Sequence, residues 1–337
     1  MNSSQTKVLV TGASGFIASH CIAELLKCGY KVKGSLRDLK IANQIRANFN
    51  EFDKNKLDFC QLDLLKDEGW SDSASDCDYL MHIASPFTIE EPKNEKVLIQ
   101  PALEGTLRAL KAANNTNIKK VVLTSSMASI AYGHNRDICG QNDWTDTSKD
   151  VGTYVKSKTL AEKAAWNYLS NEAIRPFKMT TIHPGMVFGP LINKNKLGAS
   201  ANLIINMVKG KYPALPNVFL TVVDVRDIAK LHVETLINSE SDSKRVIATS
   251  QKGISFLEIS KILRNLGYDK APKNLIPNQV INSLAAFNKE MKSTASMIKR
   301  GCYSTDLSFT KSMYNWNPIS LEQSLSDMIS SIKDLIS

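Results

Sequence analysis

The stretch Lys7-Val-Leu-Val-Thr-Gly-Ala-Ser-Gly15 decides the fold. It is a short run of apolar, β-type residues that ends in two glycines, and a helical pattern from Phe16 to Leu26 follows it. In a strand, glycine turn and helix of this kind, backbone N–H groups approach a pyrophosphate at the helix N-terminus, where the helix dipole favours negative charge. The spacing is Gly12-x-x-Gly15-x-x-Ala18, which departs from the general Gly-x-Gly-x-x-Gly pattern. The expected cofactor contacts in this turn are Gly12, Ser14, Gly15, Phe16 and Ile17.

Outward from this turn, β-type runs recur and are separated by helical patterns such as that of residues 96–114. Further strands are expected at residues 31–36, 57–62, 79–84, 119–125 and 179–182. Alternation of this kind predicts an α/β protein with a doubly wound, parallel Rossmann sheet. We expect residues 1–185 to form the dinucleotide-binding domain, with 218–250 returning to it. A smaller, mainly helical substrate-binding lobe is expected from residues 186–217 and 251–337.

The end of the second strand indicates which dinucleotide binds. A NAD-binding protein usually carries an acidic residue there for the ribose 2′-hydroxyl. This chain has Arg37, and Lys40 follows one helical turn later. Both cations suit a 2′-phosphate, which an acidic residue would repel. Asp38 is a carboxylate beside them, and the alternative is a basic helix start that binds no ligand.

Two later strands deliver further candidates to the same edge of the sheet. Asp63, with Leu64 after it, follows the third strand, and its carboxylate is expected either to face the adenine amine or to cap a helix. His82 lies inside the fourth strand, where a hydrogen-bonded core histidine is the expectation. Ala84 and Ser85 end that strand and are predicted cofactor contacts.

The run Gly152-Thr-Tyr-Val-Lys-Ser-Lys158 is the main candidate for chemistry. Because a helical pattern follows over Thr159 to Leu169, Tyr154 and Lys158 should share one helical face. An ammonium beside a phenol stabilises the phenolate, and we expect Lys158 to pull the pKa of Tyr154 down from about 10 towards the range of a general acid. The alternative is a surface tyrosine with a solvated lysine on an ordinary amphipathic helix.

Composition narrows the class of protein. The net charge of +9 is spread along the chain without a stripe of interleaved aromatics, so we expect a phosphate-bearing ligand and no nucleic acid. The six cysteines, at 21, 28, 60, 77, 139 and 302, have no metal-ligand spacing, so we expect no metal and free thiols in a reducing compartment. The N-terminus is polar and no apolar run reaches about 18 residues, so we expect no signal peptide, no membrane span and a cytoplasmic location.

Taken together, the glycine turn, Ser126 and Tyr154-x-x-x-Lys158 resemble the extended short-chain dehydrogenase/reductases. Further motifs resemble the dihydroflavonol reductase branch, which includes NADPH-dependent aldehyde and ketone reductases such as methylglyoxal reductases. These motifs are His82-Ile-Ala-Ser-Pro-Phe87, Val121-Val-Leu-Thr-Ser-Ser126, Ala161-Glu-Lys-Ala-Ala-Trp166, His183-Pro-Gly185, Phe188-Gly-Pro190 and Asp224-Val-Arg-Asp227. Ala18 stands where many relatives have Gly, and Met127 stands where relatives vary in size.

The resemblance implies a carbonyl reductase that uses NADPH/NADP. Tyr154 would donate the proton, Lys158 would hold down the phenol's pKa and bond the nicotinamide ribose, and Ser126 would orient the carbonyl oxygen. Ser126 is preferred to Ser125 by resemblance, because spacing alone does not choose between them. Further cofactor contacts are expected at Pro184, Gly185 and Val187, and an apolar substrate wall at Phe87, Met127, Val151 and Met186.

Two other functions fit the same motifs. One is a nucleotide-sugar epimerase or dehydratase that keeps a tightly held NAD, and Arg37 argues against it. The other is a non-catalytic NADP-binding protein, which would commonly lack the Tyr or the Lys that this chain keeps. The expected partner is a small carbonyl substrate, and the expected assembly is a monomer or homodimer.

Overall fold

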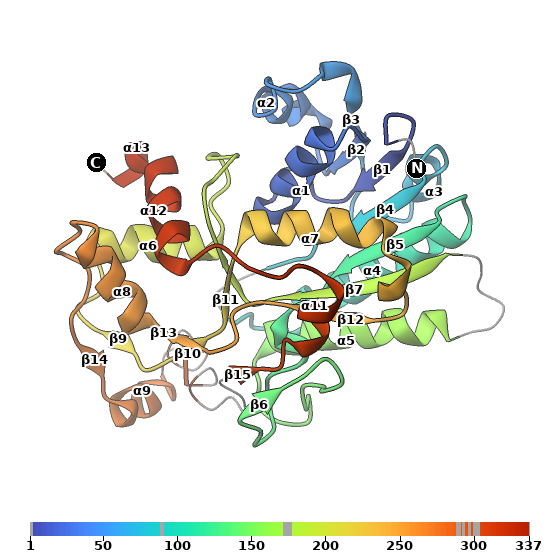
Figure 1. The fold of residues 1–337 in the computed structure, drawn as a ribbon. Helices are drawn as coiled ribbons and strands as arrows, with labels where there is room; N and C mark the ends of the chain where they lie inside the picture. The colour runs from blue at the N-terminus through green and yellow to red at the C-terminus, as the bar shows by residue number, and fades with distance from the viewer. Residues whose placement is uncertain are drawn as a thin grey trace.

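The computed structural model describes residues 3–336, except 88–90, 171–176, 288–290, 292–293, 296–297 and 299–303. Its centre is a parallel seven-stranded sheet in the order β12-β7-β5-β4-β1-β2-β3 (Figure 1). The strands are β1 (Lys7–Val10), β2 (Lys31–Leu36), β3 (Leu57–Gln61), β4 (Tyr79–His82), β5 (Lys120–Thr124), β7 (Lys178–Pro184) and β12 (Arg245–Ala248). The order reverses beside β1, so the predicted doubly wound α/β sheet is confirmed.

Helices cover both faces of this sheet (Figure 1). One face carries α1 (Phe16–Lys27) and α7 (Val225–Ile237), which pack against each other. The other face carries α3 (Trp70–Ala74), α4 (Lys96–Asn114) and α5 (Thr153–Leu169). Because both faces are covered, β1 and β4 are almost wholly buried and read as continuous apolar runs. Short elements lie at the rim: α2 (Ala42–Ala47) and the 3₁₀ turns η1 (Leu39–Ile41), η2 (Lys54–Lys56), η3 (Met127–Ser129) and η4 (Ser239–Ser241).

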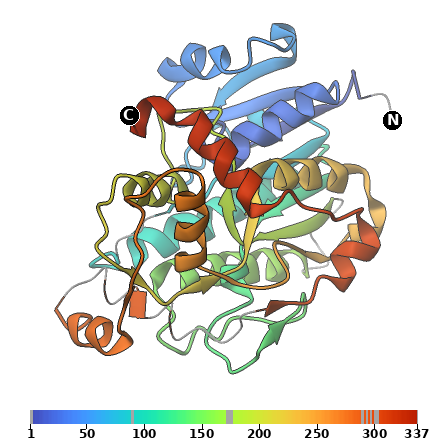
Figure 2. The same cartoon turned by 60° about the vertical axis from the view of Figure 1, so that its left-hand side comes forward.

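A second lobe lies beside the carboxyl ends of the strands (Figure 2). Its apolar core is built mainly from α6 (Ala199–Val208), α8 (Phe256–Asn265) and α12 (Leu321–Ser331). Three two-stranded ladders support it: β8 (Met186–Phe188) with β11 (Val222–Asp224), β9 (Leu215–Pro216) with β14 (Leu275–Ile276), and β10 (Phe219–Leu220) with β13 (Ile254–Ser255). The described remainder of the lobe includes α9 (Asn278–Leu284) and α13 (Lys333–Ile336).

Buried polar contacts fasten the C-terminal segment to the start of α7. Asp224, which is fully buried, caps α7 and accepts a hydrogen bond of 2.6 Å from Ser324 on α12. The backbone N–H of Ile319 donates to Asp227 at 2.8 Å. Arg226 pairs with Asp327 at 2.8 Å. These contacts hold the last described helices over the carboxyl edge of the sheet.

Two expectations differ from the structure: one concerns the packing of residues 251–337, and the other concerns the cysteines. Residues 251–337 do not all pack into the lobe, because α11 (Ser308–Met313) lies against β12, and Tyr314 joins the core beneath α1 and α7. The expectation of six free thiols is wrong for Cys139, which is disulfide-bonded and lies in β6 (Ile138–Cys139), the ladder partner of β15 (Ser304–Thr305). The four cysteines at 21, 28, 60 and 77 are free, and Cys302 lies outside the described residues.

Candidate active site

The glycine turn after β1 brings its backbone into close contact with the end of β4. Gly12 has φ +75°, and a Cβ added there would lie 3.1 Å from the Cβ of Ala84. Gly15 is the N-cap of α1 and supplies no side-chain hydrogen bond, so no side chain at this cap satisfies the first N–H groups of the helix. Such a turn at a helix N-terminus fits the pyrophosphate of a dinucleotide. Phe16 and Ile17 begin the helix, and Ser14 lies at the tip of the turn.

Thr11, which the motif analysis left without a role, joins the glycine turn to the end of β4. Its Oγ1 accepts hydrogen bonds of 3.0 Å from the N–H groups of Ile83 and Ala84 and lies 3.1 Å from Nδ1 of His82. Burial lowers the pKa of His82 to about 3, and this histidine is the buried, hydrogen-bonded core residue that the sequence predicts. Ser85 follows Ala84 in the loop after β4.

The basic pair after β2, Arg37 and Lys40, lies at the carboxyl edge of the sheet, as the glycine turn does. Arg37 and Lys40 are exposed, and Gln61 Nε2 donates to the backbone oxygen of Arg37 at 2.9 Å. The carboxylate of Asp38 caps η1 by accepting from the N–H of Lys40 at 2.9 Å. Asp38 is therefore engaged with the backbone of its own turn.

Asp63 caps the turn that follows it and not a helix, because α3 begins only at Trp70 with Gly69 as its N-cap. Its carboxylate accepts from the N–H of Leu65 at 3.0 Å, and its backbone oxygen accepts from the indole of Trp70 at 3.2 Å. Leu64 packs against Gly105 of α4, where an added Cβ would collide with it. The structure gives neither residue a contact that identifies a ligand.

The structure separates the roles of the two adjacent serines after β5. The hydroxyl of Ser125 donates to the carboxylate of Glu162 at 2.6 Å. The side chain of Ser126 instead caps η3 and forms a hydrogen bond with the hydroxyl of Tyr154. Of the two, Ser126 is therefore the serine that faces the phenol, and Ser125 is committed to the network beneath it.

Tyr154 and Lys158 share a face of α5, but their pKa values differ from the expectation. Burial raises the pKa of Tyr154 to about 12, and the hydrogen bond with Ser126 opposes this shift. Burial lowers the pKa of Lys158 to about 8, while the negative charge of Glu162 acts in the opposite direction. Lys158 Nζ donates to the backbone oxygen of Thr124 at 3.2 Å. The expected lowering of the Tyr154 pKa by Lys158 is therefore not found.

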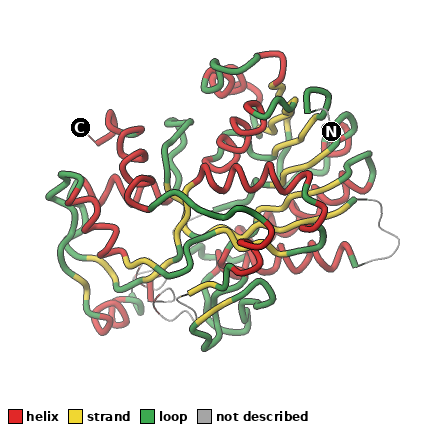
Figure 3. Tube along the Cα trace, in the orientation of Figure 1, coloured by secondary structure: helices red, strands yellow, loops and turns green. Residues whose placement is uncertain are grey.

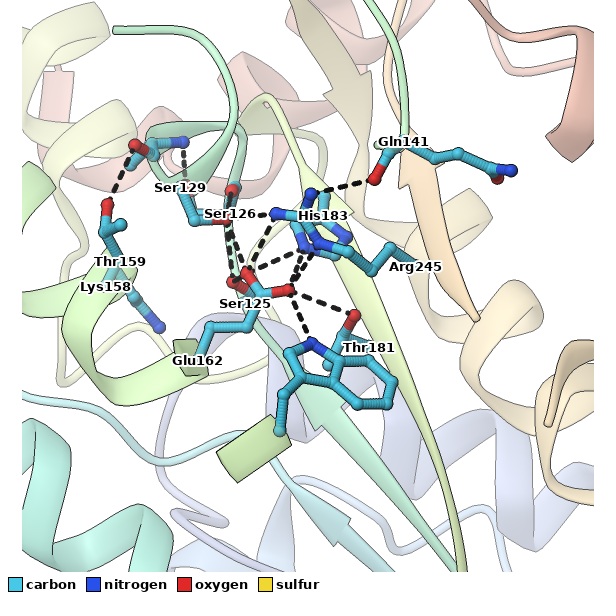
Figure 4. A network of polar contacts seen from close by, with 12 residues as sticks. Ser125, Ser126, Ser129, Gln141, Lys158, Thr159, Glu162, Thr181, His183 and Arg245 are labelled. Carbon is cyan, nitrogen blue, oxygen red and sulfur yellow. Dashed lines mark hydrogen bonds and ion pairs between the residues drawn. The ribbon is translucent and has the colours of Figure 1, made fainter. Parts of the chain in front are cut away.

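Glu162 is the centre of a buried polar network that the sequence analysis missed (Figure 4). The residue is 1% exposed, one further helical turn along α5 from Lys158. Its carboxylate accepts hydrogen bonds of 2.6–3.4 Å from the side chains of Ser125, Ser129, Trp166, Thr181, His183 and Arg245. Glu162 lies four residues after Lys158 and eight after Tyr154, so the three side chains share one face of the helix. A charged residue on this buried face was the signal in the sequence that could have revealed the network.

Arg245 extends this network to the outer strand of the sheet. It comes from β12, places its Nε 2.7 Å from Glu162 Oε1, and lies over the ring of Trp144 with 3.8 Å to the centroid. Opposite charges beside Glu162, on His183 and Arg245, lower the pKa of its carboxyl well below the usual range, against the effect of burial. Through Glu162, α5 is thus hydrogen-bonded to the end of β5, to β7 and to β12.

The residues expected to line the substrate pocket fall into two groups. Phe87 makes an edge contact with the ring of Tyr154 at a centroid distance of 5.0 Å, and Met127 and Val151 are buried in the cluster that packs against Tyr154. Met186 belongs to β8 and packs against the core of the lobe. Pro184 ends β7, Gly185 leaves no room for a Cβ beside Thr221 and Thr249, and Val187 pairs with Val223 of β11.

Within the described ranges, no cluster of His, Cys, Asp and Glu has the arrangement of a metal site. No helix in this same part of the chain is long and apolar enough to cross a membrane.

Comparison with known proteins agrees with this geometry. The model of the NAD dependent epimerase/dehydratase family matches residues 8–248. A cinnamoyl-CoA reductase of Medicago truncatula is 35% identical over 273 residues, covering 77% of this chain and 80% of that protein. The NADPH-dependent methylglyoxal reductase GRE2 of Saccharomyces cerevisiae is 31% identical over 268 residues, covering 73% of this chain and 78% of that protein.

A solved structure extends the likeness over almost the whole chain. The crystal structure of Gre2 from Candida albicans in complex with NADPH superposes with a TM-score of 0.80 at 26% sequence identity, covering 98% of this chain and 100% of that one. The matched family region contains the glycine turn, Ser126, Tyr154 and Lys158. The chain therefore belongs to the NAD dependent epimerase/dehydratase family, the extended short-chain dehydrogenase/reductases.

Proposed function

We propose that this protein is an NADPH-dependent reductase that converts a small carbonyl compound (an aldehyde, a ketone or a dihydroflavonol-type substrate) to an alcohol. The observation that carries the proposal is that Ser126 lies beside the hydroxyl of Tyr154, with Lys158 one turn further along the same helix. These groups lie at the carboxyl edge of the sheet, where the glycine turn also lies. The relatives named as NADPH-dependent reductases support the same cofactor and reaction.

The cofactor would be held along this edge by residues of several elements. The backbone of Gly12, Ser14, Gly15 and the start of α1 would bind the pyrophosphate, and Arg37 with Lys40 would bind the 2′-phosphate. The remaining proposed contacts are Asp63, Leu64, Ala84, Ser85, Tyr154, Lys158, Pro184, Gly185 and Val187. NADPH, when bound, supplies a hydride to the carbonyl carbon.

The protein's own groups would then manage the charge on the carbonyl oxygen. As the C=O bond is reduced, negative charge develops on that oxygen, and Ser126 donates a hydrogen bond to it. Tyr154 gives its hydroxyl proton to the oxygen to complete the alcohol. Tyr154, whose pKa is raised to about 12, is protonated at neutral pH and so carries the proton that the oxygen needs. The phenolate that remains then takes its next proton from water.

The substrate would lie against an apolar wall formed by Phe87, Met127, Val151 and Met186. An edge contact between Phe87 and Tyr154 supports this placement, because it puts an aromatic ring beside the proton donor. We also propose a cytoplasmic location, which the free thiols at positions 21, 28, 60 and 77 support and the disulfide-bonded Cys139 opposes. A monomeric or homodimeric assembly is proposed as well, and light scattering on the purified protein would test it.

The function is tested by following NADPH absorbance against a panel of aldehydes, ketones, 2-oxo aldehydes and a dihydroflavonol. Consumption of NADPH with at least one of these classes, and its loss in Tyr154→Phe, is the expected result. An unmodified protein that oxidises no NADPH with any carbonyl, yet interconverts nucleotide sugars with a retained NAD, would establish the epimerase alternative instead.

A further inference from the structure

Helix α5, which carries Tyr154, packs beside α4 on one face of the sheet and has no side-chain cap of its own (Figures 1 and 3). Its N-cap is Gly152, whose φ of +84° lies in the region that favours glycine. A capping serine, threonine or aspartate adopts an extended backbone instead, so none of them fits this position without strain. An acceptor for the first N–H groups of α5 must therefore come from another part of the chain or from solvent.

Glu91, in the connection from β4 to α4, supplies this acceptor. Its Oε1 accepts a hydrogen bond of 2.9 Å from the backbone N–H of Thr153, the first residue of α5, and a second one from the hydroxyl of the same residue. Thr153 is fully buried, so both of its donors depend on a partner within the protein. A carboxylate at this end of a helix is also favoured by the helix dipole. Glu91 lies 62 positions before Thr153, so this cap depends on the tertiary fold.

Phe87 and Glu91 belong to the same connection and contact consecutive residues of α5. Phe87 makes the edge contact with the ring of Tyr154, and Glu91 bonds the backbone of Thr153. Phe87 is 53% exposed, so its ring is only partly fixed by packing. Because Tyr154 is the second residue of α5, its own N–H has no partner within the helix, and its backbone position depends on a well-formed first turn. Among the described residues, Glu91 is the one that bonds the first residue of this turn from outside the helix.

We propose that Glu91 is a positioning residue for the proton donor, because its cap on α5 fixes the first turn and with it the placement of the Tyr154 hydroxyl. The inference rests on the proposed function, which makes Tyr154 the acid. A proton donor must lie within about 2.6–3.2 Å of the oxygen that it protonates. A displacement of about 1 Å can lower a rate by about 10²-fold, even when its cause lies away from the reacting atoms. Loss of the cap should therefore lower kcat more than it changes KM.

A second glutamate supplies the matched control. Glu95, at the end of the same connection, pairs with Lys156 of α5 at 3.0 Å, but this pair is partly exposed, so Glu95→Gln should change little. Glu91→Ala removes the acceptor, whereas Glu91→Gln removes the charge and keeps an oxygen that can accept from Thr153.

Steady-state rates would be measured with NADPH and the carbonyl of the panel above that the unmodified protein reduces fastest, and a fluorescence titration would measure NADPH affinity. We expect Glu91→Ala to lower kcat about tenfold or more, and to change KM and NADPH affinity by less than about twofold. Glu91→Gln should recover most of kcat, and Glu95→Gln should match the unmodified protein. NADPH binding by each variant shows that it has folded.

Three results would overturn this inference. An unchanged kcat in Glu91→Ala would mean that the cap does not position the donor. A loss of NADPH affinity or a rise in KM as large as the fall in kcat would mean that Glu91 supports binding instead. A Glu91→Gln variant as slow as Glu91→Ala would mean that the charge matters and the cap does not.

Tyr154→Phe, measured in parallel, separates these failures from failure of the proposed function. If Tyr154→Phe loses activity and Glu91→Ala keeps it, only the inference fails. If the unmodified protein reduces no carbonyl of the panel, or Tyr154→Phe remains fully active, the proposed function fails and the inference fails with it.

Discussion

At the scale of single residues, Ser125 and Ser126 show how two identical side chains acquire different roles. Ser125 donates a hydrogen bond to a buried carboxylate, and Ser126 is left beside the phenol of Tyr154. The motif alone does not distinguish them, because both follow the same strand. The distinction comes from Glu162, which is 37 positions away from Ser125 in the chain.

Replacing Tyr154 by Phe tests the proton donor. The hydroxyl is needed only once charge develops on the carbonyl oxygen, so Tyr154→Phe should lower kcat by about 10²–10⁴-fold and leave NADPH affinity nearly unchanged. Steady-state rates and a fluorescence titration with NADPH would measure the two quantities. Retention of more than about a third of the activity would remove Tyr154 as the acid.

Replacing Arg37 by Ala tests the choice of cofactor. A charged hydrogen bond to phosphate contributes about 1.5–3 kcal/mol, which corresponds to about one to two decades in affinity. The unmodified protein should therefore prefer NADPH to NADH by about tenfold or more in kcat/KM, and Arg37→Ala should lose most of this preference by weakening NADPH alone. Asp38 is engaged as a cap, so its carboxylate should oppose the phosphate weakly. Equal use of both cofactors by the unmodified protein would contradict the assignment.

At the scale of elements, α5 carries the proposed proton donor on one face and is anchored through the same face. Tyr154, Lys158 and Glu162 lie at successive turns, and only the last of them binds the neighbouring strands through a network of side chains. Glu162 also favours the charged form of Lys158, whose pKa is otherwise lowered by burial. Through Glu162, α5 is therefore held in position on the sheet, and the same carboxylate influences the pKa of Lys158.

Glu162→Gln should move the pH dependence of the reaction. Lys158, with a pKa of about 8, loses its proton before Tyr154 does, so kcat/KM should fall as the pH rises through about 8. Without the negative charge of Glu162, the pKa of Lys158 falls further, and this alkaline limb should shift to lower pH. Glu234→Gln, which changes an exposed glutamate of α7, is the matched control and should leave the profile unchanged. If the alkaline limb of the pH profile stays in place in Glu162→Gln, the charge of Glu162 does not control the pKa of Lys158.

The same variant should also be less stable, because Arg245 keeps its buried charge and loses its partner. Breaking a buried pair in this way costs about 3–5 kcal/mol, measured by urea unfolding near neutral pH. The pKa of Glu162 is lowered by folding, so its contribution is present above the unfolded value of 4.5 and is lost as the pH falls through the lowered pKa. Glu162→Gln should therefore lose less stability on acidification than the unmodified protein does.

Local patterns predicted most elements and missed those that depend on distant partners. The second strand and the helix of residues 96–114 have the predicted bounds, because apolar runs, turn residues and helix formers decide them locally. The ladder of β8 with β11 and the packing of α11 against β12 were not predicted, since each needs a neighbour from far along the chain. The Glu162 network was missed for the same reason, because most of its partners come from three other segments: the end of β5, β7 and β12.

At the scale of the whole molecule, the C-terminal segment is fastened to the sheet through Asp224. Ser324→Ala removes the hydroxyl that donates to this fully buried carboxylate, while Arg226 remains as a partner. A hydrogen bond to a charged group contributes about 1.5–3 kcal/mol, so the free energy of unfolding should fall by about this amount. Chemical denaturation would measure it. Ser330→Ala, at an exposed position of the same helix, should change stability by less than about 0.5 kcal/mol.

The fastening at Asp224 also has a consequence for the synthesis of the protein. A nascent chain that has emerged from the ribosome as far as α7 already contains Tyr154, Lys158 and every strand of the sheet except β12. It has Asp224 and Arg226 but not their partners Ser324 and Asp327, which are translated about 100 residues later. At about 5–20 residues per second, this interval lasts about 5–20 seconds. During that interval the proposed catalytic side chains exist without the completed lobe beside them, so activity should arise only after the last helices have been released.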